Sequence, residues 1–238
     1  LAVGLVLVLA IVGLAGCSPG NTVVNTNSQQ EGIWVSGQGK VTAVPDIATL
    51  SLGIQAQEAS VADAQSKATE AMNKVMDALT SNGVAKKDIQ TQYFNIQKVT
   101  RWDDKNQQEV VIGYRVTNTV TAKIRNIDKA GSIIDAVAAA GGDLTRINSI
   151  DFSVDDPTAY YKEARDKAMS DARNKGEQLA TLAEVKLGKP TYISESTYSQ
   201  SPMPVVRMTA EAASSTTPIS PGEMEITLSV QVVYAILH

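Results

Sequence analysis

Apolar and polar residues alternate along two segments near the start of the chain, and this alternation predicts strands with one buried face. Between positions 48 and 56, every even position carries Ala, Leu or Ile, and Thr, Ser, Gly or Gln stands between them. Between positions 33 and 43, a similar apolar face is interrupted by Gly37 and Gly39. Pro45 lies between the two segments and predicts the bend that separates two strands.

The same alternation predicts strands further along the chain. One is expected from Asp88 to about residue 100, and a long one carries apolar residues at most even positions from 110 to 124. The charged stretch 101–109 is expected to form the hairpin loop between them. Shorter strands are expected at 150–154 and, bounded by Pro190, at about 192–198. A clean alternation predicts a last strand at 224–236.

Three segments repeat apolar residues at helical spacing instead. The first covers about residues 61–79, after a capping-box pattern of Ser60 and Asp63, and Gly83 suits a left-handed stop. The second begins after Asn126, a candidate N-cap, and ends at the glycine pair 141–142.

The third helix follows Asp156, a candidate N-cap, with Pro157 at its first position. Its apolar stripe consists mostly of alanine, from Tyr161 through positions 164, 168 and 172 to Leu179 and Ala183. Small side chains of this kind permit the close approach of a sheet or of another helix.

The predicted elements follow the order ββαββαβαββ. Because strands in this order need not be parallel, we predict an α+β fold, with three helices packed on a largely antiparallel sheet. The domain is expected to cover residues 32–238. Residues 199–222 hold four of the eight prolines together with Ser and Thr clusters, which predicts a long loop or a disordered insertion.

The first sixteen residues are uncharged and apolar, too short for a comfortable membrane span but typical of the core of an export signal. They end in Leu14-Ala15-Gly16-Cys17, which resembles a bacterial lipobox: an aliphatic residue, two small residues, then an acylated Cys. We therefore predict a signal peptide at 1–16, lipidation at Cys17, a flexible tether at 17–31, and a protein anchored outside the cytoplasm on the cell membrane or the outer membrane. An initiator Met and a basic n-region are missing, so we expect that the sequence starts inside its gene or at a misassigned start.

The composition of the chain argues against several classes of function. The net charge is −4 and the pI about 5.1, which argues against nucleic-acid binding because a basic face is needed to displace counterions. The chain has one Cys and one His, and the His is its last residue. Such a chain cannot form a Cys–His pair, a zinc cage or an internal disulfide, so we expect no cofactor, no metal and no catalytic residue.

The sequence gives only weak evidence for other kinds of binding or catalytic site. The "GQGKVTAV" segment lacks the third Gly, or the Ser/Thr after Gly-Lys, that nucleotide binding requires, so its glycines are better explained by close approach of another backbone. The acidic clusters lack the loop spacing of a calcium site. Met203 and Met208 remain a remote option as copper ligands. A Ser–Lys hydrolase stays open, although neither Ser-x-x-Lys nor Gly-x-Ser-x-Gly occurs.

Four segments carry a resemblance to a known family: "VSGQGKVTAVPDIATLSLGI", "DIQTQYFNIQ", "GYRVTNTVTAKIRNIDKAGSIIDAVAAAGG" and "INSIDFSV". In this order and spacing they resemble the SIMPL-domain family, of the periplasmic immunogenic and oxidative-stress defence type, over about residues 32–236. The resemblance implies an exported protein without assigned chemistry. Some members are linked to oxidative stress, at least one forms a ring-like homo-oligomer, and a eukaryotic member is a signalling adaptor.

The resemblance also marks recurrent positions, most of them expected to serve turns, caps and close backbone contacts. These positions are Gly37, Gly39, Pro45, Asp46, Asp88, Thr91, Gly113 and Tyr114. The lipobox and the Pro-rich loop depart from many members, so an assembly seen in a soluble relative need not hold for a tethered chain.

We consider three possible functions, ranked from the best supported by the sequence to the least. The first is a non-enzymatic, lipid-anchored and self-associating envelope scaffold or stress-protective factor, supported by long strands whose edges need partners. The second is a binding module for a small ligand, a cell-wall fragment or a partner protein, with the loop 199–222 as its candidate surface. The third is a hydrolase with a carboxylate site.

Overall fold

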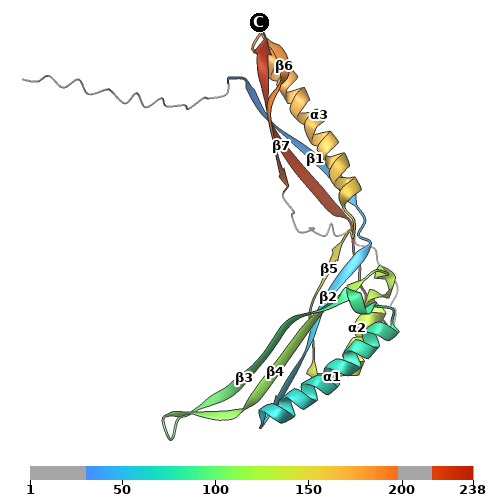
Figure 1. Ribbon diagram of the computed structural model, residues 1–238, viewed down its shortest axis with the longest axis vertical. Coiled ribbons are helices and arrows are strands. Elements are labelled where there is room, and N and C mark those ends of the chain that lie inside the picture. The colour runs from blue at the N-terminus through green and yellow to red at the C-terminus, as the bar shows by residue number, and fades with distance from the viewer. Residues whose placement is uncertain (1–30, 198–215, 238) are drawn as a thin grey trace, which may run out of the picture. The chain divides into compact units, whose positions relative to one another are not determined.

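The order of helices and strands agrees with the order predicted from the sequence, and the fold is α+β. The computed structural model describes residues 31–197 and 216–237 (Figure 1). The predicted signal peptide, Cys17, Met203, Met208 and nearly all of the tether therefore lie outside the described residues, as do residues 199–215 of the Pro-rich loop. The remaining loop residues, 216–222, form no helix or strand.

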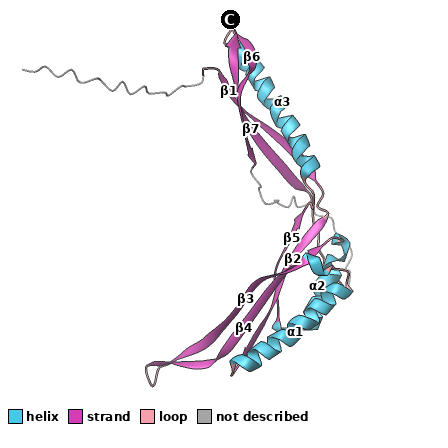
Figure 2. Ribbon diagram, viewed as in Figure 1, coloured by secondary structure: helices cyan, strands magenta, loops and turns pink. Residues whose placement is uncertain are grey.

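The described residues form seven strands and three α-helices (Figure 2). The strands are β1 (Ile33–Ala43), β2 (Ile47–Glu58), β3 (Ile89–Asp103), β4 (Gln108–Ile124), β5 (Thr145–Ser153), β6 (Lys186–Thr197) and β7 (Met224–Leu237). The helices are α1 (Val61–Ser81), α2 (Ala130–Gly141) and α3 (Thr158–Leu182), with short 3₁₀ turns η1 (Lys86–Asp88), η2 (Ile127–Lys129) and η3 (Gly142–Leu144).

The strands divide between two antiparallel sheets, whereas the sequence predicted one. The first has the order β1-β7-β6 and the second the order β3-β4-β2-β5. The division falls at Pro45, where three residues separate β1 from β2. The bend at Pro45 was predicted. The sequence did not indicate that β1 pairs with the distant β7 instead of with β2.

The four-stranded sheet has its own apolar core, covered by α1 and α2. The even residues of β2 face this core, and α1 contacts both β2 and β4. Its largest fully buried side chains are Leu50, Leu52, Ile54, Val75, Leu79, Val116, Ile124, Ile133 and Val137. The alternation in β2 thus buries one face of the strand, as predicted.

The three-stranded sheet packs against α3, which lies along β1 and β7. The buried residues of α3 recur at every fourth position: Ala164, Ala168, Ala172, Gly176 and Ala180. The predicted stripe was therefore correct for Ala164, Ala168 and Ala172. It was wrong for Leu179, which is exposed one position away from this row, and for Ala183, which is exposed just beyond the end of α3. Opposite α3, the core contains Val35, Val41, Leu228, Val230, Val232 and Tyr234.

Several predicted helix ends are confirmed. Ser60 caps α1, since its Oγ accepts a hydrogen bond from the N–H of Asp63 at 3.1 Å. Gly83 and Gly142 have positive φ angles of 93° and 56° at the ends of α1 and α2. The predicted start of α3 is off by one residue, because Pro157 is the N-cap and the helix begins at Thr158, whose N–H donates to the Asp156 carboxylate at 3.0 Å.

Other boundaries need correction. The Asn126 side chain caps no helix, because the turn η2 precedes α2. The hairpin loop shrinks to residues 104–107, as β3 and β4 continue through most of the charged stretch. Pro190 lies inside β6 and not at its start. Proline, which has no N–H to donate, is tolerated here because β6 is an edge strand and its register shifts on both sides of this residue.

Candidate functional site

Gly37 and Gly39 are the points where the backbones of β1 and α3 come closest. A Cβ added at Gly39 would lie 1.8 Å from the carbonyl oxygen of Ala164, and one added at Gly37 would lie 2.0 Å from that of Ala168. The two glycines therefore have the role expected from the sequence, close approach of another backbone.

Asp46 follows Pro45 and connects the start of β2 to the segment after β5. Its carboxylate accepts a hydrogen bond from the N–H of Asp155 at 2.7 Å, and its own N–H donates to the carbonyl of Ser153 at 3.1 Å. Pro45 and Asp46 thus act together, since the first bends the chain and the second fixes the bend to a neighbouring segment.

Arg125 joins this carboxylate region to Asp88, a recurrent position far away in the sequence. Its Nε and Nη2 donate to the two carboxylate oxygens of Asp88, both at 2.9 Å, and its Nη1 donates to Asp155 at 2.5 Å. Lys123 donates to the other oxygen of Asp155 at 2.5 Å. We call these residues and Asp46 the Arg125 network. A bidentate guanidinium–carboxylate pair combines strength with a fixed geometry.

The Arg125 network lowers the pKa values of two carboxyl groups, those of Asp88 and Asp155. The hydrogen bond from Arg125 holds the pKa of Asp88 below its usual range, although partial desolvation opposes the shift. Hydrogen bonds from Lys123 and then Arg125 lower the pKa of Asp155. The guanidinium of Arg125 has its pKa raised, chiefly by its bond to Asp88.

These directions predict a dependence of stability on pH. A carboxyl whose pKa is lower in the folded state stabilises the fold above its unfolded value and loses that contribution as the pH falls through its folded pKa. We expect Asp88→Asn to melt at a lower temperature than wild type at neutral pH. The difference should shrink below about pH 4, where an unfolded aspartate begins to protonate.

Thermal melts followed by circular dichroism between neutral and acidic pH would measure this difference. Asp77→Asn is the matched control, because Asp77 lies on the exposed face of α1. Its melting temperature should follow that of the wild type at every pH. A pH-independent gap between Asp88→Asn and wild type would contradict a role for the charged pair.

The remaining recurrent positions belong to the four-stranded sheet. Thr91 pairs with Val120, directly before an irregularity in the β3–β4 register. Gly113 has a φ of 153°, and a Cβ there would lie 2.7 Å from the carbonyl oxygen of Glu58, so this position requires glycine. Tyr114 pairs with Glu58 at the last point where β2 accompanies β4. All three positions serve the sheet.

An exposed apolar surface lies on the hairpin of β3 and β4, where the sequence analysis identified only two long strands and a loop. β4 pairs with β2 no further than Tyr114, so residues 99–113, which we call the distal ribbon, form a two-stranded hairpin. Trp102 is 55% exposed, and Val110, Val111 and Ile112 are exposed beside it. In Figure 2 the tip of this hairpin lies apart from α1.

A comparison with protein families decides the identity. The family model described as "SIMPL: Protein of unknown function (DUF541)" matches residues 33–234. The chain belongs to the SIMPL family.

Similar proteins include other members from bacteria. The 26 kDa periplasmic immunogenic protein of Brucella melitensis is 36% identical over 221 residues, which cover 88% of this chain and 86% of that protein. The Brucella abortus protein of the same name is 35% identical over the same length. The uncharacterized protein YggE of Escherichia coli K12 is 32% identical over 201 residues, which cover 84% of this chain and 80% of YggE.

Neither the SIMPL family description nor these names indicate an enzyme class. In the described parts of this SIMPL chain, no three His, Cys, Asp or Glu side chains group as metal ligands. Across residues 31–197 and 216–237, no helix is both long enough and apolar enough to cross a membrane. The acidic residues that come together in the Arg125 network are ion-paired or hydrogen-bonded to backbone.

Sequence reasoning found two of the five residues of this network. Asp46 and Asp88 were marked by the SIMPL resemblance, but Lys123, Arg125 and Asp155 were not. The available signal was the position of the charges: Arg125 directly follows the apolar end of β4, and Asp155 lies two residues after the end of β5. Two opposite charges at the ends of strands in the same sheet can meet, but only the strand order shows that they do.

Proposed function

We propose that this SIMPL protein is a lipid-anchored, extracytoplasmic protein that acts without catalysis and assembles with copies of itself as an envelope scaffold or stress-protective factor. The argument for assembly rests on the distal ribbon. A two-stranded hairpin is marginally stable alone in water, and this one also exposes large apolar side chains. Pairing with a second copy would cover both the side chains and the strand edge.

The edge of β3 supports the same proposal. β3 runs for 15 residues at the end of the sheet, and no strand in the described ranges pairs with its outer side. Tyr93 and Phe94 are 52% and 53% exposed on it. A long edge strand with unpaired backbone groups is a template for pairing with another chain. The distal ribbon has two basic and three acidic residues, so little net charge opposes contact between copies.

Static light scattering after size-exclusion chromatography tests this assembly. We expect a particle several times heavier than the 25.2 kDa chain. A strict monomer at all concentrations would contradict the proposal.

The extracytoplasmic location draws support from the periplasmic immunogenic relatives and from the lipobox pattern at Cys17. Acylation by two or more chains would hold the protein stably on a membrane, where a single chain would not. Such an anchor also raises the local concentration of copies and thereby favours assembly.

Mass spectrometry of the N-terminal peptide from membrane fractions tests the anchor. We expect the chain to begin at Cys17, with a mass increase that corresponds to a diacylglyceryl group. Cys17→Ser should abolish this mass increase and move the protein out of the membrane fraction. Recovery of unprocessed protein with a free thiol would contradict the anchor and leave the assembly proposal unaffected.

A second candidate function, a binding module, is favoured by a hollow on the three-stranded sheet. The sequence placed the binding surface on residues 199–222. In the described part of that loop, Thr217 is held by Asp135 of α2, with its N–H and Oγ1 donating to the carboxylate at 3.1 and 2.5 Å. These bonds fix the described end of the loop against α2. The hollow is the candidate site argued below.

A further inference from the structure

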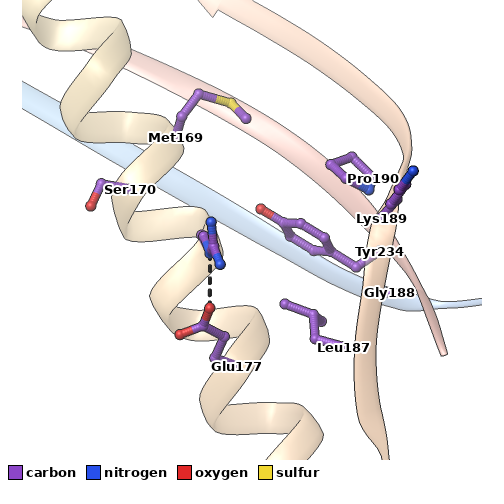
Figure 3. A pocket seen from close by; sticks show the side chains of 9 residues that line it. Met169, Ser170, Glu177, Leu187, Gly188, Lys189, Pro190 and Tyr234 are labelled. Atoms are coloured by element: carbon purple, nitrogen blue, oxygen red, sulfur yellow. Dashed lines mark hydrogen bonds and ion pairs between the residues drawn. The ribbon is translucent and has the colours of Figure 1, made fainter. Parts of the chain in front are cut away.

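A hollow of about 640 Å³ opens between α3 and β6, over the end of β7 (Figure 3). The lining residues used below are Met169, Arg173, Glu177, Leu187, Lys189 and Tyr234. Its wall is mainly apolar, and its charged residues stand at exposed positions on α3 and β6. Apolar surface combined with a few polar groups is the usual composition of small-molecule sites.

The packing of α3 explains why the hollow exists. Gly37 and Gly39 have no side chains, so α3 packs closely on β1. The helix therefore contacts β1 and β7 extensively and β6 only slightly. The inner face of β6 is therefore left partly uncovered. Beside the hollow, Gly176 lets α3 pack closely on the sheet, since a Cβ there would lie 3.2 Å from the ring of Tyr234 and 3.3 Å from Leu187.

Tyr234 gives the hollow a hydrogen-bond donor. Its residue surface is only 4% exposed, and Figure 3 shows its hydroxyl directed from the sheet toward α3. Within the described ranges, this hydroxyl has no hydrogen-bond partner. Burial raises the pKa of Tyr234, so the hydroxyl stays protonated and able to donate at neutral pH. A hydroxyl at the wall of the hollow can therefore donate a hydrogen bond to an acceptor bound there.

Two cations flank the hollow. Lys189 projects from β6, and Arg173 projects from α3, where its Nε donates to Glu177 at 2.8 Å. The Arg173 and Glu177 side chains are 71% and 51% exposed, and such exposed pairs contribute little stability. Arg173 can therefore turn to an incoming anion at small cost, so the hollow has two available cations against one carboxylate.

We propose that this hollow binds a small amphipathic carboxylate with an unbranched acyl tail. The head group accepts hydrogen bonds from the Tyr234 hydroxyl and is attracted by Arg173 and Lys189, while the tail lies against Met169 and Leu187. Met169 and Glu177 are two turns apart on α3, which corresponds to about 12 Å and suits a medium-chain acid. This site is separate from the distal ribbon and does not require self-assembly.

Isothermal titration calorimetry of the full chain with decanoate, below its micelle concentration, tests the site. We expect one decanoate per chain and much weaker binding of decylammonium, which has the same tail and the opposite charge. Tyr234→Phe keeps the ring but removes the donor, and it should weaken decanoate binding about tenfold or more, because a hydrogen bond to a charged group contributes about 1.5–3 kcal/mol. Lys189→Glu should weaken it by a similar factor.

Tyr93→Phe is the matched control, since Tyr93 lies on β3 in the other sheet, and it should bind decanoate like wild type. Absence of binding, equal binding of decylammonium, or unchanged affinity in both Tyr234→Phe and Lys189→Glu would overturn the proposal. Light scattering on the same samples reports self-assembly independently, so failure of one proposal is distinguishable from failure of the other.

Discussion

Gly39→Ala is expected to destabilise the protein strongly, although it adds a single methyl group to a strand. The new Cβ would lie 1.8 Å from the carbonyl oxygen of Ala164 and 2.7 Å from the amide nitrogen of Ala168. Both atoms belong to the backbone of α3, so no side-chain rotation can relieve the clash. The helix must move off β1, and with it the alanine row loses its contact with the sheet.

The expected cost is at least about 3 kcal/mol in the free energy of unfolding, the upper part of the range for overpacked cores, because the obstacle here is backbone. Urea unfolding followed by circular dichroism would measure it. Gln38→Ala is the control, since Gln38 is the exposed neighbour on β1 and uses only its backbone N–H to bond Asp171. A loss below about 1 kcal/mol for Gly39→Ala would mean that β1 and α3 pack less closely than described.

Replacing Trp102 and Val111 together by Glu is expected to convert the proposed assembly into monomers. The register pairs Thr100 with Val111 and Trp102 with Glu109, so the two apolar side chains lie on the same face of the distal ribbon. Burying two added carboxylates between copies without partners would be strongly unfavourable. If this face is central to the interface, each substitution removes a contact of about 2 kcal/mol or more.

Light scattering would measure the loss of assembly, and thermal melts would show that the fold survives, because both positions are exposed within a single chain. Leu182→Glu provides the control: it replaces a side chain that is 82% exposed at the end of α3, away from the ribbon. That variant should assemble like wild type. Assembly of the Trp102/Val111 double variant at wild-type size would place the interface elsewhere.

The sequence predicted the local features of this fold because they depend on neighbouring residues. Alternation in β2 and β7, the capping pair at Ser60 and Asp63, and the stop at Gly83 all follow from side-chain spacing and backbone preference. The alanine row of α3 and the glycines of β1 also predicted a close backbone contact. Both segments have small residues at the positions where they meet, but the sequence did not indicate that they pack against each other.

The candidate sites were less predictable because they combine residues from distant segments. Asp88 and Arg125 are separated by 37 positions, and Tyr234 meets Arg173 and Leu187 only where α3 leaves β6 partly uncovered. The exposure of Trp102 could not be predicted either. Its position in a strand suggests half burial, and only the strand order shows that no further strand within residues 31–197 and 216–237 pairs with the ribbon.

The sequence by itself determined which residues form strands and helices and which face of each is apolar, because periodicity acts within one segment. Tertiary structure decided that β1 leaves β2 for β7, that two separate cores form, and that β3 remains at an edge. The physical reason is that an apolar face specifies burial without specifying a partner. The choice among possible partners depends on register, on backbone approach at positions such as Gly39, and on which arrangement buries both faces at once.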